Sequence, residues 1–129
     1  IPKIEPHIIT NQSFKVNGVE VLPIEVFHYK LPVFGYRIGD VTYITDANKI
    51  DPEEFEKMRG SKILVLNALR KTEHISHFTL EEALVIIKEI QPEKAYLTHI
   101  SHLMGKHDEV NLELPDNVEI AYDGLQVEL

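Results

Sequence analysis

The stretch that decides the fold runs from His74 to His102 and reads HISHFTLEEALVIIKEIQPEKAYLTHISH. Thr79 and Glu82 have the spacing of a capping box, which predicts a helix that starts directly after Thr79 and ends near Ile90, before a proline. The apolar residues recur at the spacing of a helix with one buried face: Leu80, Ala83, Leu84 and Ile87. Lys94–Thr98 is then predicted as a strand, and a helix that leads directly into a strand is typical of a layered α/β fold.

Upstream of this stretch the sequence predicts paired strands and one more helix. Asn17-Gly18 is a strong signal for a two-residue hairpin, and Gly39-Asp40 marks a second turn. The helix is expected after an acidic N-cap, Asp51, and Gly60 is expected to end it. The predicted strands are Phe14–Val16, Val19–His28, Val33–Ile38, Val41–Thr45 and Ile63–Leu66.

Downstream of the stretch we expect a short helix around Asp108–Leu114. Val118–Tyr122 and Leu125–Leu129 are then predicted to form a hairpin across Asp123-Gly124. Strands come first and later alternate with helices, which predicts one α/β layered domain over residues 1–129.

Composition limits the classes of function. The length suits one domain, and 43% hydrophobic and 26% charged residues are ordinary for a globular protein. Thirteen basic and 21 acidic residues give a net charge of −8, which disfavours binding to nucleic-acid phosphates. No apolar run approaches the ~20 residues that span a bilayer, so we expect no membrane association. The sequence has seven histidines and no cysteine, which limits any metal site to imidazole and carboxylate ligands and fits a cytoplasmic protein.

Four polar residues stand at predicted strand ends or in nearby loops, where α/β proteins place functional groups: His28, Asp46, His77 and His99. Taken singly, His28 is explained as a hydrogen-bonded core histidine, Asp46 as a turn residue and His77 as a solvated loop residue. His99 and His102 lie three residues apart at a strand exit, which is as compatible with metal binding or acid–base chemistry as with a structural role. His102 is a candidate for orienting a metal ligand. The remaining histidines are assigned no role: His7, His74 and His107.

The stretch from His74 to His102 resembles the C-terminal half of the metallo-β-lactamase-fold hydrolases. Within that family it is most similar to the branch of cyclic phosphodiesterases of phosphonate metabolism, with ribonuclease Z as a close relative. VFHYKLPVFGYRIGDVTYITDA (residues 26–47) and LPDNVEIAYDGLQVEL (residues 114–129) resemble the segments on either side. The resemblance implies one half of an αββα sandwich, with a mixed sheet and its helices on one face.

The resemblance also implies roles for single residues. His28 and His99 correspond to metal-binding histidines, and Asp46 corresponds to the aspartate that bridges two metals. His77 corresponds to the histidine near the scissile phosphate that is proposed to donate a proton to the leaving group. In such enzymes the two divalent metals are typically zinc or manganese.

Two departures from the family pattern affect what this chain is expected to do. The H-x-H-x-D-H loop, which supplies most ligands of both metals and belongs to the N-terminal half, is absent. Asn67 stands where the family often has an acidic residue that supports the site. Since the chain also starts at Ile1 and has no methionine before Met58, we expect it to be part of a longer protein. By itself it is expected to bind one metal weakly or none, and to associate as a homodimer through an exposed apolar sheet face.

These features predict a metal-dependent hydrolase of small or cyclic phosphodiesters. In this hypothesis the metals lower the pKa of a bridging water to about 7, hydroxide attacks phosphorus, and His77 protonates the departing oxygen. Three alternatives stay open: a nuclease of the tRNA 3′-processing type, a thioester or lactone hydrolase of the same fold, and a non-catalytic half-domain that binds a partner. The acidic charge balance counts against the nuclease, and the four retained site positions count against the non-catalytic module.

Overall fold

A seven-stranded mixed sheet organises the protein, and the computed structural model describes all of residues 1–129. The strands lie across the sheet in their order along the chain. They are β1 (Phe14–Val16), β2 (Val19–His28), β3 (Leu31–Ile38), β4 (Val41–Ile44), β5 (Ile63–Asn67), β6 (Lys94–Thr98) and β7 (Val118–Ile120). The helices are α1 (Pro52–Met58), α2 (Leu80–Ile90) and α3 (His107–Glu113), with a 3₁₀ turn, η1, at His102–Met104.

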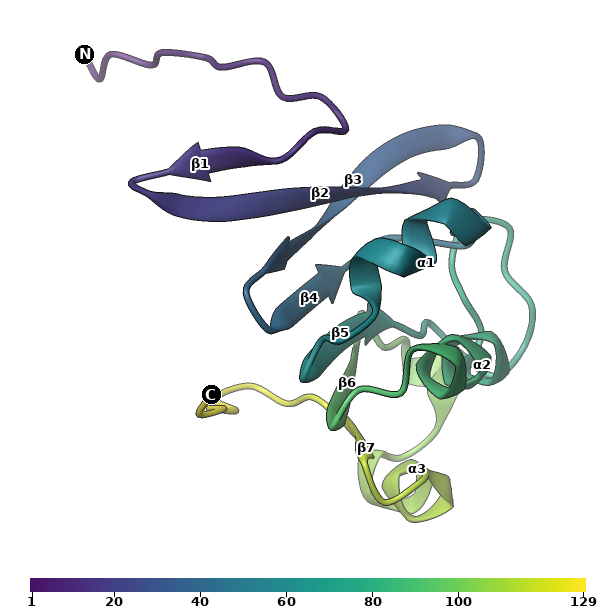
Figure 1. Ribbon diagram of the computed structural model, residues 1–129. Coiled ribbons are helices and arrows are strands. Elements are labelled where there is room, and N and C mark those ends of the chain that lie inside the picture. The colour runs from purple at the N-terminus through teal and green to yellow at the C-terminus, as the bar shows by residue number, and fades with distance from the viewer.

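The sheet changes from antiparallel to parallel at β4. The pairs from β1 to β4 are antiparallel, and those from β4 to β7 are parallel. Consequently β2, β4, β5, β6 and β7 all run in the same direction, and their carboxyl ends lie along one edge. α1 and α2 pack on one side of the sheet, as the ribbon shows (Figure 1). The expected mixed sheet with helices on one face is confirmed.

Local sequence signals account for the first hairpin and for α2. Asn17 and Gly18 both have positive φ, 49° and 79°, as the predicted two-residue turn requires. Thr79 Oγ1 accepts a hydrogen bond from Glu82 N at 3.1 Å, and Thr79 N donates to Glu82 Oε1 at 2.9 Å. The predicted capping box is therefore present at the start of α2.

The start of α1 departs from the prediction in one respect. Asp51 occupies the N-cap position, but its carboxylate makes no capping hydrogen bond. It pairs instead with Lys49 Nζ at 3.2 Å. The Glu54 carboxylate, three residues further on, is also turned away from the cap, because it accepts from Glu25 N at 2.9 Å and pairs with Lys57 Nζ at 2.9 Å.

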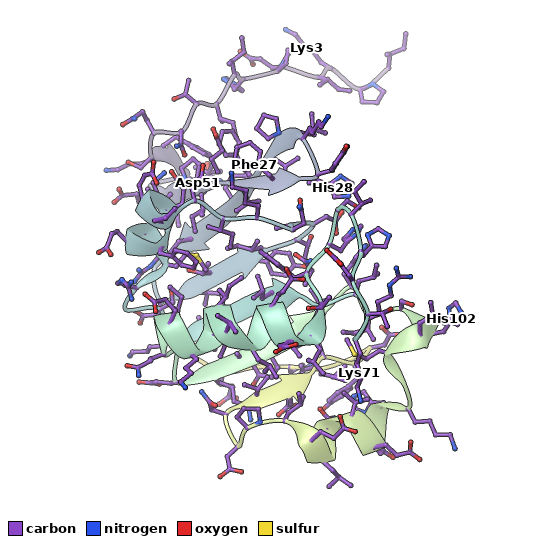
Figure 2. All side chains as sticks on the ribbon, turned by 90° about the vertical axis from the view of Figure 1, so that its right-hand side faces the viewer. Lys3, Phe27, His28, Asp51, Lys71 and His102 are labelled. Atoms are coloured by element: carbon purple, nitrogen blue, oxygen red, sulfur yellow. The ribbon has the colours of Figure 1, made fainter.

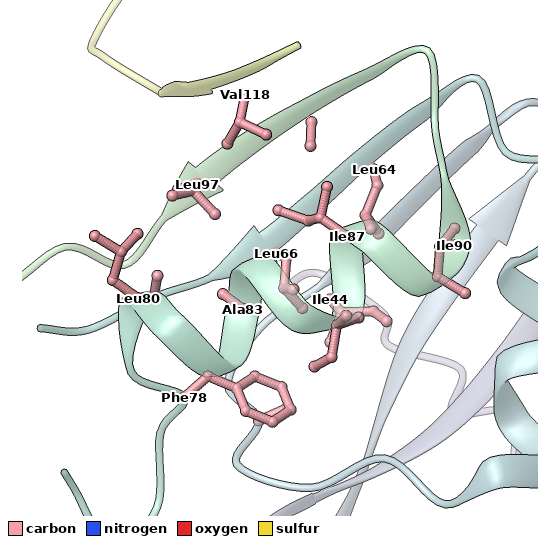
Figure 3. Close-up of a cluster of buried hydrophobic side chains, with 14 of the residues drawn as sticks. Ile44, Leu64, Leu66, Phe78, Leu80, Ala83, Ile87, Ile90, Leu97 and Val118 are labelled. Carbon is pink, nitrogen blue, oxygen red and sulfur yellow. The ribbon is translucent and has the colours of Figure 1, made fainter. Parts of the chain in front are cut away.

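The hydrophobic core lies between the sheet and the helices. Side chains on a strand alternate between its two faces, so register partners on neighbouring strands form rows on the inner face. One such row consists of Ile44, Leu66, Leu97 and Ile120. α2 covers these strands (Figure 3) with the side chains that it buries: Leu80, Ala83, Ile86, Ile87 and Ile90. The predicted face was correct apart from Leu84, which is only partly buried.

The predicted C-terminal hairpin is wrong, since residues after β7 form no strand. The outward backbone groups of Ile120 are already used: its N–H donates to Asn111 Oδ1 at 2.8 Å, and its carbonyl lies 3.2 Å from His107 Nε2. A returning strand would have no partner there. Instead the chain turns at Tyr122, whose carbonyl accepts from Leu125 N at 3.1 Å, and lines an apolar groove on the outer face of the sheet.

None of the helices combines the length and the apolar character that crossing a bilayer requires.

Candidate metal centre

The candidate site lies along the edge where the carboxyl ends of the strands meet. His28 is the last residue of β2, Asp46 is the second residue after β4, and His99 comes directly after β6. His77 approaches the same edge in the loop between β5 and α2. Because these strands run in the same direction, residues far apart in sequence converge here.

The four side chains form one cluster, in which His77 neighbours each of the other three. His28, Asp46 and His77 each offer one possible ligand atom, and these three atoms all lie within 4.8 Å of one another. His99 Nδ1 lies 3.3 Å and His77 Nε2 lies 3.9 Å from Asp46 Oδ1. The His77 ring stacks on that of His99 with centroids 4.7 Å apart, and it meets the His28 ring edge-on at 4.9 Å. The structure therefore gathers all four sequence candidates into one cluster.

Two buried atoms in this cluster have no hydrogen-bond partner, namely Asp46 Oδ1 and His77 Nε2. Leaving a buried polar group unpaired costs about 1–3 kcal/mol, so such atoms are rare in folded proteins. Imidazole nitrogen and carboxylate oxygen are ligands that zinc and other divalent metals accept. A divalent cation placed among these atoms would satisfy both of them, so the residues fit a metal.

Burial sets the protonation of His77. Its burial lowers the pKa of the imidazole below the ordinary value, and the neighbouring His99 lowers it further. The Asp46 carboxylate opposes this shift, while His28 and His74 add to it. A lowered pKa favours the neutral ring, which has a free nitrogen lone pair for a metal or a proton.

The backbone of His99 has the left-handed conformation, with φ of 59°. This region is uncommon for residues other than glycine and carries a conformational cost. The cost is consistent with a requirement to direct the imidazole of His99 at Asp46, whose Oδ1 lies 3.3 Å from His99 Nδ1.

Asn67 holds Ala47, whose carbonyl joins the segments that carry Asp46 and His77. Its side chain is completely buried, and its Oδ1 accepts from Ala47 N while its Nδ2 donates to Ala47 O, both at 2.8 Å. The Ala47 carbonyl also accepts from Phe78 N at 2.8 Å. A carboxylate at position 67 would have no hydrogen to donate to this carbonyl, so the amide suits the backbone of this chain.

His102 stands apart from the cluster. It begins η1, its side chain is exposed, and no hydrogen bond or ion pair joins it to the other candidates. In Figure 2, His28 and His102 lie on the same side of the molecule but are well separated. Its role in orienting a metal ligand stays a prediction, as do the individual roles of His28, Asp46, His77 and His99.

Two residues near His77 were missed by sequence reasoning. Ser76 Oγ lies 3.0 Å from His77 Nδ1 and 3.3 Å from His74 Nδ1. The rings of His74 and His77 have centroids 5.0 Å apart. The available signal was the order His-x-Ser-His directly before a capping box, which places two imidazoles and a hydroxyl in one short loop.

Comparisons with known proteins place the fold and the family. A sequence model of the beta-lactamase superfamily domain matches residues 2–100. A solved structure described as a new diphosphatase from the PhnP family superposes with a TM-score of 0.94 and 35% identity, over 97% of this chain and 49% of that one. The short form of human tRNase Z superposes with a TM-score of 0.67 and 18% identity, over 89% of this chain and 46% of that one, and at this identity the likeness shows the fold alone.

One curated protein also matches. An octanoyltransferase of Porphyromonas gingivalis (strain ATCC BAA-308 / W83) is 37% identical over 117 residues, which make up 90% of this chain and 24% of that protein. The chain thus spans about a quarter of this curated relative and about half of the solved diphosphatase. Because most of the octanoyltransferase lies outside the match, its name does not assign a reaction to the matched segment.

Proposed function

Because this chain belongs to the beta-lactamase superfamily, we propose that it forms part of a metal-dependent hydrolase that acts on small or cyclic phosphodiesters. The observation that carries the proposal is the pair of buried, unpartnered atoms on Asp46 and His77 within a cluster of imidazoles. The 35% identity to a diphosphatase supports phosphoryl chemistry over thioester or lactone hydrolysis.

His28, Asp46 and His99 would hold a divalent metal, either zinc or manganese. When bound, such a metal acts as a Lewis acid on a phosphoryl oxygen and lowers the pKa of water. His77 faces the same space and would give a proton from Nε2 to the departing oxygen. Asn67 would hold the Asp46 and His77 segments in register through Ala47.

This chain alone offers few ligands for two metals. A two-metal site, with ions roughly 3.5–4 Å apart, needs more ligands than one aspartate and a few histidines. We therefore propose that turnover belongs to a longer protein that also supplies an H-x-H-x-D-H loop. The chain alone would hold one metal weakly or none.

The test compares this chain with the product of the full-length gene. Bound metal is measured by elemental analysis, and hydrolysis is measured with bis(p-nitrophenyl) phosphate. We expect only the longer protein to hold about two metals per chain and to cleave the diester. A longer protein that is loaded with metal and cleaves a lactone or thioester but no diester would overturn the choice of substrate.

Variants of the longer protein assign the residues. Asp46→Asn is expected to lower the metal content, whereas His77→Ala is expected to lower kcat more than it changes KM. His7→Ala is the matched control, because His7 is exposed in the N-terminal segment and contacts none of the cluster. An unchanged kcat in His77→Ala would remove His77 from the reaction.

We also propose that the outer face of the sheet binds a second copy of this chain when no other segment covers it. A groove of about 380 Å³ on this face is lined by eleven residues, ten of which are hydrophobic, the other being Thr98. Apolar surface of this kind is usually covered in soluble proteins. This observation favours the partner-binding alternative, which is compatible with a hydrolase whose other half lies elsewhere.

A further inference from the structure

The short loop before α2 places His74 and Ser76 beside the Nδ1 atom of His77, while the Nε2 atom of His77 faces Asp46. Ser76 is buried, and its Oγ lies 3.0 Å from His77 Nδ1 and 3.3 Å from His74 Nδ1. The two Nδ1 atoms are themselves 3.3 Å apart. Neither the family likeness nor the proposed reaction has given His74 or Ser76 a task.

The backbone of the loop sets the direction of these hydrogen bonds. Ser76 N donates to His74 Nδ1 at 3.2 Å, so this nitrogen is an acceptor and a neutral His74 carries its proton on Nε2. His77 Nδ1 faces the same nitrogen, and two ring nitrogens without hydrogen would repel each other. The contact is therefore favourable when His77 Nδ1 carries a hydrogen, which Ser76 Oγ or His74 Nδ1 accepts.

The other side of the His77 ring supports the same assignment. A hydrogen on Nε2 would need an acceptor, but the Asp46 oxygen that it faces is 3.9 Å away, beyond hydrogen-bond length. A neutral imidazole has one N–H, so a hydrogen on Nδ1 leaves a lone pair on Nε2. Both Nε2 and the facing carboxylate oxygen are then acceptors, which accounts for their lack of a partner.

We propose that His74 and Ser76 are positioning residues that keep the ring hydrogen of His77 on Nδ1 and leave its Nε2 lone pair facing Asp46. The inference rests on the proposed function and deepens it, since this lone pair is the acceptor that can take up the proton which His77 then gives to the departing oxygen. Which ring nitrogen of a histidine carries the hydrogen is set by the hydrogen bond that the other nitrogen makes, and Ser76 Oγ is the partner here. In this arrangement His77 gives up a proton from Nε2 only after it has taken one up there.

The first test reads the hydrogen position directly, on the metal-free chain at neutral pH. Two-bond ¹H–¹⁵N correlation spectra of histidine-labelled protein distinguish a protonated from an unprotonated ring nitrogen. We expect His77 to be protonated at Nδ1 and His74 at Nε2. A wild-type spectrum with His77 protonated at Nε2 would overturn the proposal, whether or not the chain binds metal or cleaves an ester.

Variants then test the cause. Ser76→Ala with His74→Phe removes both acceptors near His77 Nδ1 while keeping a ring at position 74, so we expect its Nε2–H form to increase. Ser76→Thr keeps the hydroxyl and is expected to preserve the wild-type spectrum. Ser13→Ala is the control, since Ser13 is exposed and distant in sequence. A double variant that is folded by circular dichroism and has the wild-type spectrum would refute the positioning role.

Diester hydrolysis by the full-length gene product loaded with Zn²⁺ gives a second readout. Loss of a supporting partner typically lowers activity about 10–100-fold, and we expect this fall in kcat for Ser76→Ala with His74→Phe but not for Ser76→Thr. The substrate is bis(p-nitrophenyl) phosphate. Equal kcat values for the double variant and wild type would contradict the proposal. Failure of the wild type to cleave the diester would instead contradict the proposed function, and the spectra would still decide the hydrogen position.

Discussion

The Asn67 side chain makes hydrogen bonds with both backbone polar groups of Ala47, each 2.8 Å long. Asn67 is the last residue of β5 and Ala47 lies in the loop after β4, both at the carboxyl edge of the sheet. Ala47 directly follows Asp46, and its carbonyl also accepts from the residue after His77. The Asn67 amide thus holds Ala47 in place, and the Ala47 carbonyl joins the two segments that carry the unpartnered atoms of the candidate metal centre.

Asn67→Ala is expected to destabilise the protein and to loosen the metal centre. It leaves the buried Ala47 N–H without a partner, which costs about 1–3 kcal/mol of unfolding free energy. Urea denaturation measures this loss. Asn117→Ala is the matched control, because it removes one 3.2 Å bond to Pro92 O just before β6 and β7 begin, at the opposite edge of the sheet from the cluster. Equal stabilities of the Asn67→Ala variant and wild type would show that the connection through Ala47 contributes nothing.

Stability is expected to fall in acid through Glu54. Burial alone would raise the pKa of this carboxyl, but hydrogen bonds from Lys57, Asn11 and the Glu25 N–H outweigh it and hold the pKa below its ordinary value of 4.5. The unfolded chain therefore takes up the proton at higher pH than the native protein does. The stabilisation that the Glu54 carboxylate provides is complete above the pKa that this group has in the unfolded chain. It is lost as the pH falls through the lower pKa that the group has in the native protein.

Glu54→Gln tests this pH dependence. The variant is expected to be less stable than wild type at neutral pH and to lose less stability as the pH falls below the ordinary carboxyl pKa of 4.5 and through the lowered native pKa. Thermal unfolding followed over this range provides the measurement. Glu53→Gln is the control, since Glu53 is the exposed neighbour on α1. Parallel pH profiles for the Glu54→Gln variant and wild type would exclude Glu54 as the source.

Tyr43→Lys is expected to reduce self-association of the chain. Tyr43 lies on the outer face of β4, lines the apolar groove and is 52% exposed. A charge there opposes burial against a second copy. Light scattering after gel filtration measures the mass, and Leu112→Lys is the control because Leu112 is 87% exposed on α3, away from the groove. A wild-type chain that is monomeric at high concentration would refute association through this face.

Gly35→Ala is expected to destabilise the sheet. A methyl group at this position would lie 2.6 Å from Ile44 Cγ1 and 2.9 Å from Tyr43 O. The backbone oxygen cannot move without disturbing the pairing of β3 and β4, and overpacking of this kind costs about 1–3 kcal/mol. The midpoint of chemical denaturation reports the loss. An unchanged midpoint would mean that β3 can shift to accept the methyl group.

Local signals in the sequence predicted most elements and marked the four members of the cluster as candidates, whose roles only the family resemblance implied. The turn at Asn17-Gly18 and the capping box at Thr79 depend on a few adjacent residues, so they can be recognised without knowledge of the fold. His28, Asp46 and His99 were found because period-two alternation marks where a strand ends. The missing strand after β7 was not predictable in this way, because it depends on α3 residues that occupy the edge of β7.

The tertiary structure decided which of these residues meet and which others support them. The amino-acid sequence places polar residues after several strands, but only a common strand direction brings Asp46, His77 and His99 within a few ångströms. Likewise, Asn67 is an ordinary strand-end residue until β5 lies beside β4 and its amide reaches Ala47. Hydrogen bonds across strands and loops depend on distance and direction in space, which residue type and local spacing do not contain.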